Sequence, residues 1–294
     1  MDDFSVRLDQ LWDYDRPQVS LERFKTELEG HPAGSREALE TMTQIARAQG
    51  LQRRFDEADR ALDTVAANLK RVPARVRVRY LLERGRVRNS AGEPEKAMTW
   101  FTQAADSAVS DKLPGSEFYR VDALHMLAIA APPADRLDRN LEALAAAEAS
   151  TDPRVRRWRA SLYNNIGWTY HDRGDYAQAL HYFELALPAW EERGGASNVR
   201  VAKWAIARAL RSLGRNDEAL AMQEALRAET ERIHEPDGYI YEELGELALA
   251  RKDANASRWF AKAYELLKDD ANFAATEPAR LARLRSLAQS GVPQ

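Results

Sequence analysis

The most regular run of apolar positions in the chain extends from Tyr163 to Trp190. Large and small residues follow one another there in a set order: Tyr163, Ile166, Gly167 and Tyr170, then Gly174, then Ala179, Phe183 and Ala186. Spacings of three and four residues place the side chains of each half on one face of a helix. The glycine between the halves suits a helix C-terminus, where a positive φ is needed. The pattern therefore predicts two antiparallel helices that cross closely at their small residues.

The same order recurs along most of the chain. The small residue in the second helix of each pair returns at intervals of about 40 residues, as Ala58, Ala97, Asn140, Ala179, Ala219 and Ala256. A large apolar residue stands four positions later in five of the six copies: Leu62, Phe101, Leu144, Phe183 and Phe260, with Gln223 as the exception. A small residue also precedes each marker by eleven or twelve positions. These repeats predict about six helix pairs, each packed at small residues.

The residues between the apolar runs agree with this interpretation. Gly92, Gly174 and Gly214 each lie five residues before a marker, as helix C-caps would. No stretch shows the sustained alternation of a half-buried strand, so we expect an all-α protein. Pro188 conflicts with the pattern, because a proline should end or kink the helix that begins near Asp175.

These landmarks resemble the tetratricopeptide repeat, in which a bulky residue, Leu or Ile with Gly or Ala, and Tyr are followed by Ala, Phe and Ala. The match is near complete in residues 160–193, good in 78–110 and 238–268, partial around Ala58 and Ala219, and poor around Asn140. A spacing near 40 exceeds the usual 34. It is similar to the extended-helix variety of kinesin light chains and bacterial peptide receptors. The resemblance implies a right-handed α-solenoid, a superhelix of stacked helix pairs.

Segments outside the repeats suit terminal caps, which a repeat array needs at both ends. Phe4, Leu8, Leu11 and Trp12 form one amphipathic stripe, and Leu21, Phe24 and Leu28 form another. We therefore expect N-terminal capping helices in residues 1–33, the repeat array in 34–270, and a C-terminal capping helix and tail in 271–294.

Composition narrows the range of functions. The net charge of the 294 residues is only −3, which gives no general attraction to nucleic acid or to a membrane surface. There is no cysteine, so disulfides and thiolate chemistry are excluded. The first residues are acidic and lack an apolar signal segment. We expect a cytoplasmic protein without nucleic-acid or membrane partners.

The resemblance places the first helix of each pair along a concave groove. Projecting the family's fifth, ninth and twelfth positions onto the chain gives candidate peptide-binding residues: Asn164, Trp168 and His171, then Trp204, Arg208 and Arg211, with Arg79, Arg86 and Asn89 in an earlier repeat and Glu242 and Glu246 in the last. Asparagine amides can hold a peptide backbone, arginines can clamp a carboxylate, and indoles offer flat apolar area. The groove would be basic in the middle and acidic toward its C-terminal end.

Structural explanations for the same residues remain open. Trp168 can simply pack between neighbouring repeats, because tryptophan is usually largely buried. Asn164 and Asn165 can bridge adjacent first helices instead of contacting a ligand.

Residue patterns for catalysis or metal binding are weak. His171 and His181 lack the H-E-x-x-H spacing, and Gly194–Gly195 is not followed by a phosphate-loop lysine. We therefore expect no enzyme activity, no metal and no cofactor. The leading hypothesis is a module that binds an extended peptide or partner helix, with an acidic segment as one form of partner. Alternatives are a peptide-responsive sensor and a self-assembling scaffold, which exposure of Trp12, Trp100 or Trp259 in one apolar patch would favour.

Overall fold

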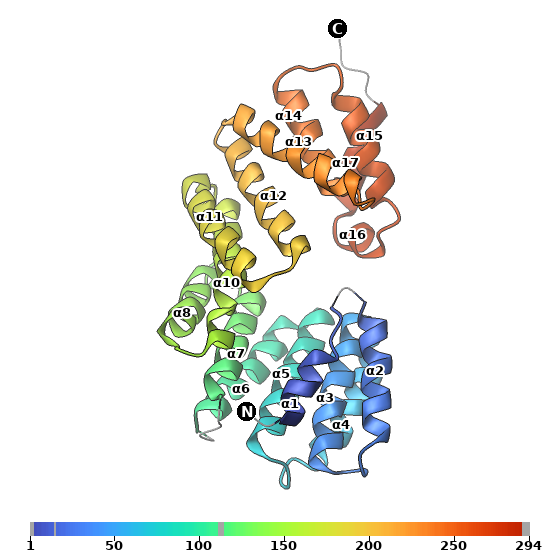
Figure 1. Cartoon of the computed structure of the whole chain (residues 1–294), viewed down its shortest axis with the longest axis vertical. Helices are drawn as coiled ribbons and strands as arrows, with labels where there is room; N and C mark the ends of the chain where they lie inside the picture. The colour runs from blue at the N-terminus through green and yellow to red at the C-terminus, as the bar shows by residue number, and fades with distance from the viewer. Residues whose placement is uncertain (1–2, 15, 111–114, 290–294) are drawn as a thin grey trace. The chain divides into compact units, whose positions relative to one another are not determined.

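The computed structural model describes residues 3–14, 16–110 and 115–289. Its regular elements are all α-helices, and no β-strand occurs in these ranges. The chain divides into two compact units, unit 1 with residues 1–162 and unit 2 with residues 163–294. The all-α, paired-helix architecture predicted from the repeats is confirmed (Figure 1).

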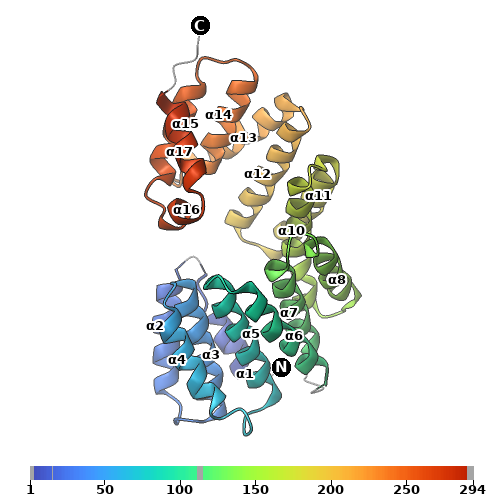
Figure 2. The same ribbon diagram turned by 180° about the vertical axis from the view of Figure 1, so that it is seen from behind.

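Unit 1 begins with two helices that precede the repeats. Its elements are α1 (Asp3–Gln10), α2 (Pro17–Glu29), α3 (Arg36–Leu51), α4 (Phe55–Ala66), α5 (Ala74–Ser90), α6 (Pro94–Ser110), α7 (Ser116–Ala130), α8 (Arg136–Ala149) and the short α9 (Pro153–Arg156). Pairs α3–α4, α5–α6 and α7–α8 each carry a predicted marker residue in the second helix. Figure 2 shows α4 on the side of the unit turned away from α1.

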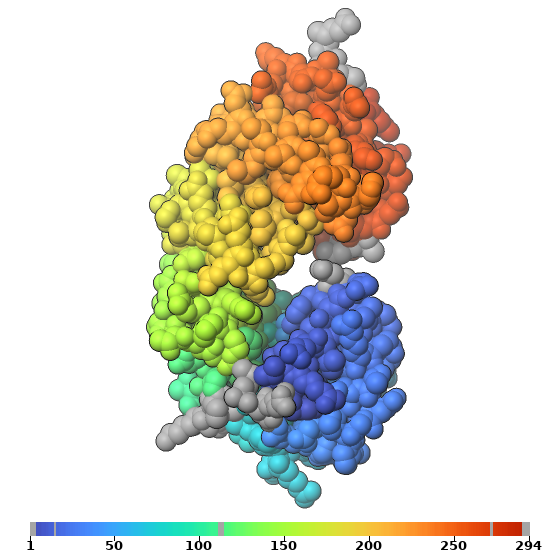
Figure 3. Space-filling model, viewed as in Figure 1, coloured from blue at the N-terminus to red at the C-terminus, as the bar shows by residue number. Residues whose placement is uncertain are grey.

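Unit 2 continues the same pattern. It contains α10 (Trp158–Asp172), which starts just before the unit boundary, α11 (Tyr176–Arg193), α12 (Ala196–Ser212), α13 (Asn216–Arg232), α14 (Gly238–Ala250), α15 (Ala256–Leu267), α16 (Ala271–Thr276) and α17 (Pro278–Gln289). Pairs α10–α11, α12–α13 and α14–α15 complete the six predicted pairs. In each unit the side chains fill the spaces between the ribbons (Figure 3).

Close helix crossings explain the recurring order of small and large residues within the repeats. A Cβ added to Gly167 would lie only 2.5 Å from Cε1 of Phe183, and one added to Gly245 only 2.8 Å from Cε1 of Phe260. Both phenylalanines are completely or almost completely buried. The aromatic ring of the second helix therefore occupies the space that the missing side chain leaves on the first.

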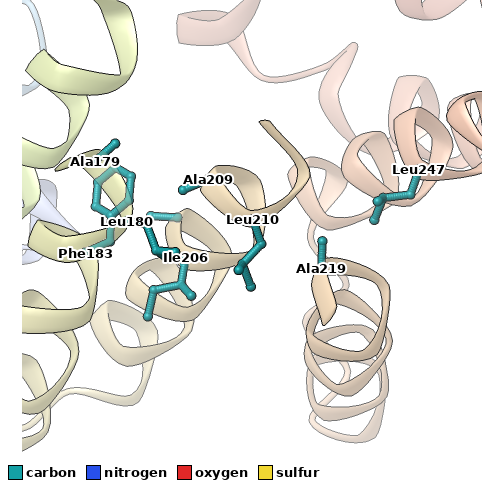
Figure 4. Close-up of a cluster of buried hydrophobic side chains, with 9 residues drawn as sticks. Ala179, Leu180, Phe183, Ile206, Ala209, Leu210, Ala219 and Leu247 are labelled. Carbon is teal, nitrogen blue, oxygen red and sulfur yellow. The ribbon is translucent and has the colours of Figure 1, made fainter. Parts of the chain in front are cut away.

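Neighbouring pairs are joined by apolar packing between the second helix of one and the first helix of the next. In Figure 4, Leu180 and Phe183 of α11 face Ile206 of α12, and Leu210 on the same helix lies toward α13 and α14. These side chains are buried in one cluster with Ala219 and Leu247. The hydrophobic contact along unit 2 is therefore continuous from pair to pair, as a stack of repeats requires.

Pro188 does not end its helix, so that part of the sequence-based expectation was wrong. Helix α11 continues from Tyr176 to Arg193 with the proline inside it. Pro188 is exposed, and so is Glu184, whose carbonyl would have accepted a bond from the missing N–H. Because both groups lie at the surface, water can satisfy that carbonyl.

The predicted N-terminal stripes form one core with the first repeat. Leu8, Leu21 and Phe24 are buried together with Ile45 and Ala48 of α3. The side chains of Phe4, Leu11, Trp12 and Leu28 pack against this cluster. Helices α1 and α2 therefore cover the apolar side of α3.

Candidate functional site

Aromatic rings from the three first helices of unit 2 and from the short helix α16 form a continuous line. Ring centroids are 5.7 Å apart between Trp168 and Trp204, 6.0 Å between Trp204 and Tyr239, and 5.6 Å between Tyr239 and Phe273. The indole Nε1 of Trp204 also donates a hydrogen bond to the backbone oxygen of Tyr239 at 3.2 Å. The line joins α10, α12, α14 and α16, and three of its four rings are half-buried.

Arginines lie against these rings. The guanidinium of Arg208 is 5.9 Å from the ring of Trp168 and 5.6 Å from that of Trp204. The guanidinium of Arg280 is 5.4 Å from Tyr239 and 5.5 Å from Phe273. Cation–π attraction therefore holds both arginines on the same surface as the aromatic line.

Two further sequence candidates, Asn164 and His171, lie on α10. Asn164 is half-buried. His171 contacts Trp168 with ring centroids 5.3 Å apart, and its Nε2 lies 3.1 Å from Oγ of Ser212. Burial and the nearby charge of Arg208 lower the pKa of His171, so the imidazole is neutral at neutral pH.

Arg208 and Arg211 both hold a carboxylate, but it belongs to the chain itself. Nη1 of Arg208 donates to Oε1 of Glu243 at 2.6 Å, and Nε of Arg211 donates to Oε2 at 2.7 Å. The Glu243 side chain is only 1% exposed, whereas those of Arg208 and Arg211 are 25% and 23% exposed. The guanidiniums therefore lie above a buried carboxylate. Because two cations pair with one anion, this part of the surface is positively charged.

The two glutamates predicted to make the far end of the groove acidic are also paired. Glu242 accepts from Nε and Nη2 of Arg280 at 2.8 and 2.6 Å, and Glu246 accepts from Nη1 of Arg283. Glu242 is buried, and Arg283 is the most exposed of these four residues. The expectation of an acidic C-terminal end was wrong, because α17 places two cations over those carboxylates.

Together these contacts define one surface, which we call the first-helix face of unit 2. Its members are Asn164, Trp168, His171, Trp204, Arg208, Arg211, Tyr239, Arg280 and Arg283. The carboxylates of Glu242 and Glu243 lie beneath the guanidiniums. A molecule approaching this face meets half-buried aromatic rings and cationic groups.

The candidates in unit 1 occupy a different environment. Arg79 is buried between Glu40 and Asp9, 3.1 Å from a carboxylate oxygen of each, and Arg86 donates to Glu83 at 2.6 Å and also to Asp122. Burial opposes both charges, yet the neighbouring carboxylates raise the pKa of Arg79 and Arg86 above the ordinary value. Both guanidiniums are therefore committed to contacts within unit 1.

Asn89 is half-buried near the end of α5, and its backbone oxygen accepts from the amide of Gly92 at 3.0 Å. This bond belongs to the helix C-terminus. It does not involve the side-chain amide that would hold a peptide backbone.

Comparison with known families identifies part of this architecture. Residues 159–193 and 205–239 match the family model described as tetratricopeptide repeat. These two segments are tetratricopeptide repeats. They contain the first-helix residues Asn164, Trp168, His171, Arg208 and Arg211, so the resemblance drawn from the sequence is confirmed for these two segments.

Solved structures show that the repeat fold extends over the rest of the chain. A tetratricopeptide repeat protein from Parabacteroides merdae ATCC 43184 has a TM-score of 0.55 at 17% identity and covers 98% of this chain and 99% of its own. The apo form of RapI has a TM-score of 0.66 at 12% identity, covering 86% and 96%. NprR in complex with its cognate peptide NprX has a TM-score of 0.57 at 14% identity, covering 97% and 81%. No curated protein matches. At these identities the likeness establishes the fold.

Sequence reasoning missed Tyr239, Arg280 and Arg283 of the first-helix face and the carboxylate of Glu243 beneath it, and three of these four carry a signal. Glu243 follows Glu242 directly and stands 35 residues after Arg208, close to the length of one tetratricopeptide repeat. Arg280 and Arg283 are three residues apart on α17, so they share one helical face. Treating α17 as a further first helix would have placed them opposite the glutamates.

Two general searches of the described residues complete the description. They hold no group of three or more histidine, aspartate or glutamate side chains arranged to bind a metal ion. Among the same residues, no helix combines the length and apolar character that crossing a membrane requires.

Proposed function

We propose that the chain is a protein-interaction module whose first-helix face in unit 2 binds an extended acidic segment of a partner protein. The observation that carries the proposal is the layering of charge, with guanidiniums at the surface and carboxylates beneath them. Glu243 is 1% exposed, whereas Arg283 at the outer end is 48% exposed. A partner therefore meets the four guanidiniums, although the three carboxylates of Glu242, Glu243 and Glu246 pair with them.

The arginines keep donors for a second carboxylate. A guanidinium carries five N–H donors, and the bonds to Glu242 use only those on Nε and Nη2 of Arg280. The bond from Arg208 to Glu243 uses Nη1. Its cation–π contacts with Trp168 and Trp204 fix the plane of the guanidinium before a ligand arrives. Such preorganisation reduces the entropy lost on binding.

The remaining members of the face suit a peptide. The half-buried amide of Asn164 has both donor and acceptor capacity for a backbone. The half-buried rings of Trp168 and Trp204 offer flat contact area for apolar side chains between the acidic ones. The fold also supports the proposal, since NprR, a protein of the same fold, was solved with its cognate peptide.

The test is a fluorescence-anisotropy titration with a short fluorescein-labelled peptide of alternating glutamate and alanine. We expect salt-sensitive binding that weakens about tenfold in a double variant, Asn164→Ala with Arg283→Gln, because charge-assisted and amide contacts are lost. Arg283 is chosen because it is half-exposed, so its removal does not leave a deeply buried carboxylate alone.

A matched control is Arg251→Gln. Arg251 lies just past α14, pairs with the exposed Asp217 at 2.6 Å, and carries the same charge without joining the face. This variant should bind as the parent does. Equal binding of a lysine–alanine peptide, or equal loss in the control, would show that the face does not select acidic segments.

A peptide-responsive sensor is the second candidate, favoured by the same fold likeness to NprR with its peptide. It predicts that bound peptide alters protection beyond the first-helix face. Amide exchange of the second helices α11 and α13 would be slowed in a sensor and unaffected in a simple binding module.

A self-assembling scaffold would be favoured by an exposed apolar patch around Trp12, Trp100 or Trp259, and these residues do not form one. Trp12, Trp100 and Trp259 are each half-buried, and none is exposed in a shared patch. Trp12 packs on the N-terminal core and Trp259 on the C-terminal one. Trp100 contacts Tyr80.

A further inference from the structure

A cavity in unit 1 is lined by none of the candidate protein-binding residues. It has a volume of about 560 Å³ and lies between α5, α6 and the segment that joins α4 to α5. Helices α5 and α6 lie side by side in Figure 2. Its walls include Leu69, Tyr80, Leu81 and Trp100, and the rest of the lining is polar: Lys70, Arg77, Gln103 and Ser107. This volume falls in the range of small-molecule sites, about 300–1,000 Å³.

The walls are aromatic and apolar. Tyr80 and Trp100 meet edge to face, with ring centroids 6.0 Å apart and planes at 87°. Tyr80 and Leu81 are buried, so both form the floor. The hydroxyl of Tyr80 accepts from Nε of Arg84 at 3.3 Å, which satisfies its polar end. A flat apolar group would therefore fit against the rings without leaving the hydroxyl unpaired.

A second aromatic pair in the chain has a cation close to each of its rings. Tyr241 and Trp259 in unit 2 are also 6.0 Å apart. There, Arg227 lies 5.8 Å from the ring of Trp259, and Lys262 lies 6.0 Å from the ring of Tyr241. In unit 1 the guanidinium of Arg84 lies 5.4 Å from the ring of Tyr80. Trp100 borders the cavity that Lys70 and Arg77 line.

We propose that this cavity binds a small flat aromatic molecule that carries one anionic group. The aromatic body lies against Trp100 and Tyr80, and the anion faces Lys70 and Arg77. Charge complementarity at the lining selects an anion, and the volume admits a molecule of about two fused rings. This inference is independent of the proposed protein-binding face, because no residue belongs to both sites.

The test is isothermal titration of the full chain with three probes: 2-naphthoate, 2-naphthyl phosphate and the neutral 2-naphthalenemethanol. We expect saturable one-to-one binding of at least one anion and binding of the alcohol about tenfold weaker. The ratio of the two anions distinguishes a carboxylate ligand from a phosphate ligand. Replacing Lys70 and Arg77 together by glutamine should remove the preference for the anion.

Two variants separate the cavity from general apolar binding. Trp100→Ala should abolish binding of all three probes, and Trp259→Ala should leave it unchanged. Because Trp100→Ala also removes a packing contact, Gln103→Trp serves as a second variant that fills the cavity from its lining. The proposal is overturned if no probe saturates, if the alcohol binds as tightly as the anions, or if Trp259→Ala weakens binding as much as Gln103→Trp.

Discussion

The indole rings of Trp168 and Trp204 lie 5.7 Å apart on the first helices of two successive tetratricopeptide repeats. Trp168 also lies 5.0 Å from the ring of Phe183 on its own partner helix. One side chain thus joins α10, α11 and α12 and still keeps part of its surface exposed. The structural and the ligand-binding interpretations of this residue are therefore compatible, since packing on one side fixes the orientation of the other.

The triad of Arg208, Arg211 and Glu243 should be strongly coupled. Replacing both arginines by methionine leaves the carboxylate of Glu243 buried without a cation, which should cost about 3–5 kcal/mol of unfolding free energy. Adding Glu243→Met should restore most of that loss. Urea denaturation of the double and triple variants measures both effects.

A matched control for that cycle is Arg215→Met, which removes an exposed pair with Glu218 and should leave the denaturation midpoint almost unchanged. A triple variant no more stable than the double one would mean that the carboxylate finds other partners when the arginines are gone.

Gly167 should not tolerate alanine. Its Cβ would lie 2.5 Å from Cε1 of the buried Phe183, so the crossing must open, at a cost of about 1–3 kcal/mol. Gly50 in α3 is the matched control, because its Cβ would lie 3.5 Å from Val87 Cγ2, an ordinary contact. Gly50→Ala should stabilise the protein by up to about 1 kcal/mol through helix propensity. Opposite shifts in the melting temperatures of the two variants would confirm the difference, and equal shifts would refute it.

Gln223 is a site for stabilisation. The side chain is completely buried in α13, and neither its amide nitrogen nor its amide oxygen has a partner among the described residues. Gln223→Met keeps the length and removes the unsatisfied amide, which should add about 1 kcal/mol to the unfolding free energy. Gln178→Met, on the exposed side of α11, should have almost no effect. Loss of stability in the buried variant would imply that the amide has a bound water.

Asp122 should contribute to acid denaturation. Burial opposes its ionisation, but Arg86 and Arg47 nearby hold its pKa below the ordinary value. A depressed folded-state pKa gives stability that is present above the unfolded value, about 3.9, and is lost as pH falls toward the folded one. Asp122→Asn should therefore lower stability at neutral pH and flatten its decline below about pH 4.

Thermal melts at several pH values check this expectation. Asp106→Asn, on the exposed side of α6, is the control and should keep the parent's acid dependence. If stability falls with pH in the Asp122 variant as steeply as in the parent, other carboxylates of unit 1 cause the acid denaturation.

The repeats could be predicted from sequence because each pair depends on local spacing. Gly167 with Phe183, and Gly245 with Phe260, were placed correctly since a small residue and a ring at fixed offsets leave one way to pack. The expectation that Pro188 could end its helix was wrong, because that effect depends on exposure, which spacing does not reveal.

The electrostatics of the candidate site could not be predicted to the same extent. Glu242 and Glu246 would make the surface acidic only if no cation covered them. Arg280 and Arg283 of α17 cover both. Arg79 likewise gave no sign in the repeat pattern that it would meet Asp9 from the N-terminal helix. Contacts from helices outside the repeats decide which charges remain at the surface, and the period of the repeat carries no information about them. Whether the face binds a peptide stays a prediction.

The sign of the charge on the first-helix face alternates from helix to helix. Arginines lie on α12, glutamates on α14 and arginines on α17. Deleting the single pair α14–α15 would bring Arg208 and Arg211 opposite Arg280 and Arg283, and duplicating it would set glutamate against glutamate. Loss or gain of a single helix pair here would therefore be opposed electrostatically, whereas duplication of the four helices α12–α15 as one block would keep the alternation.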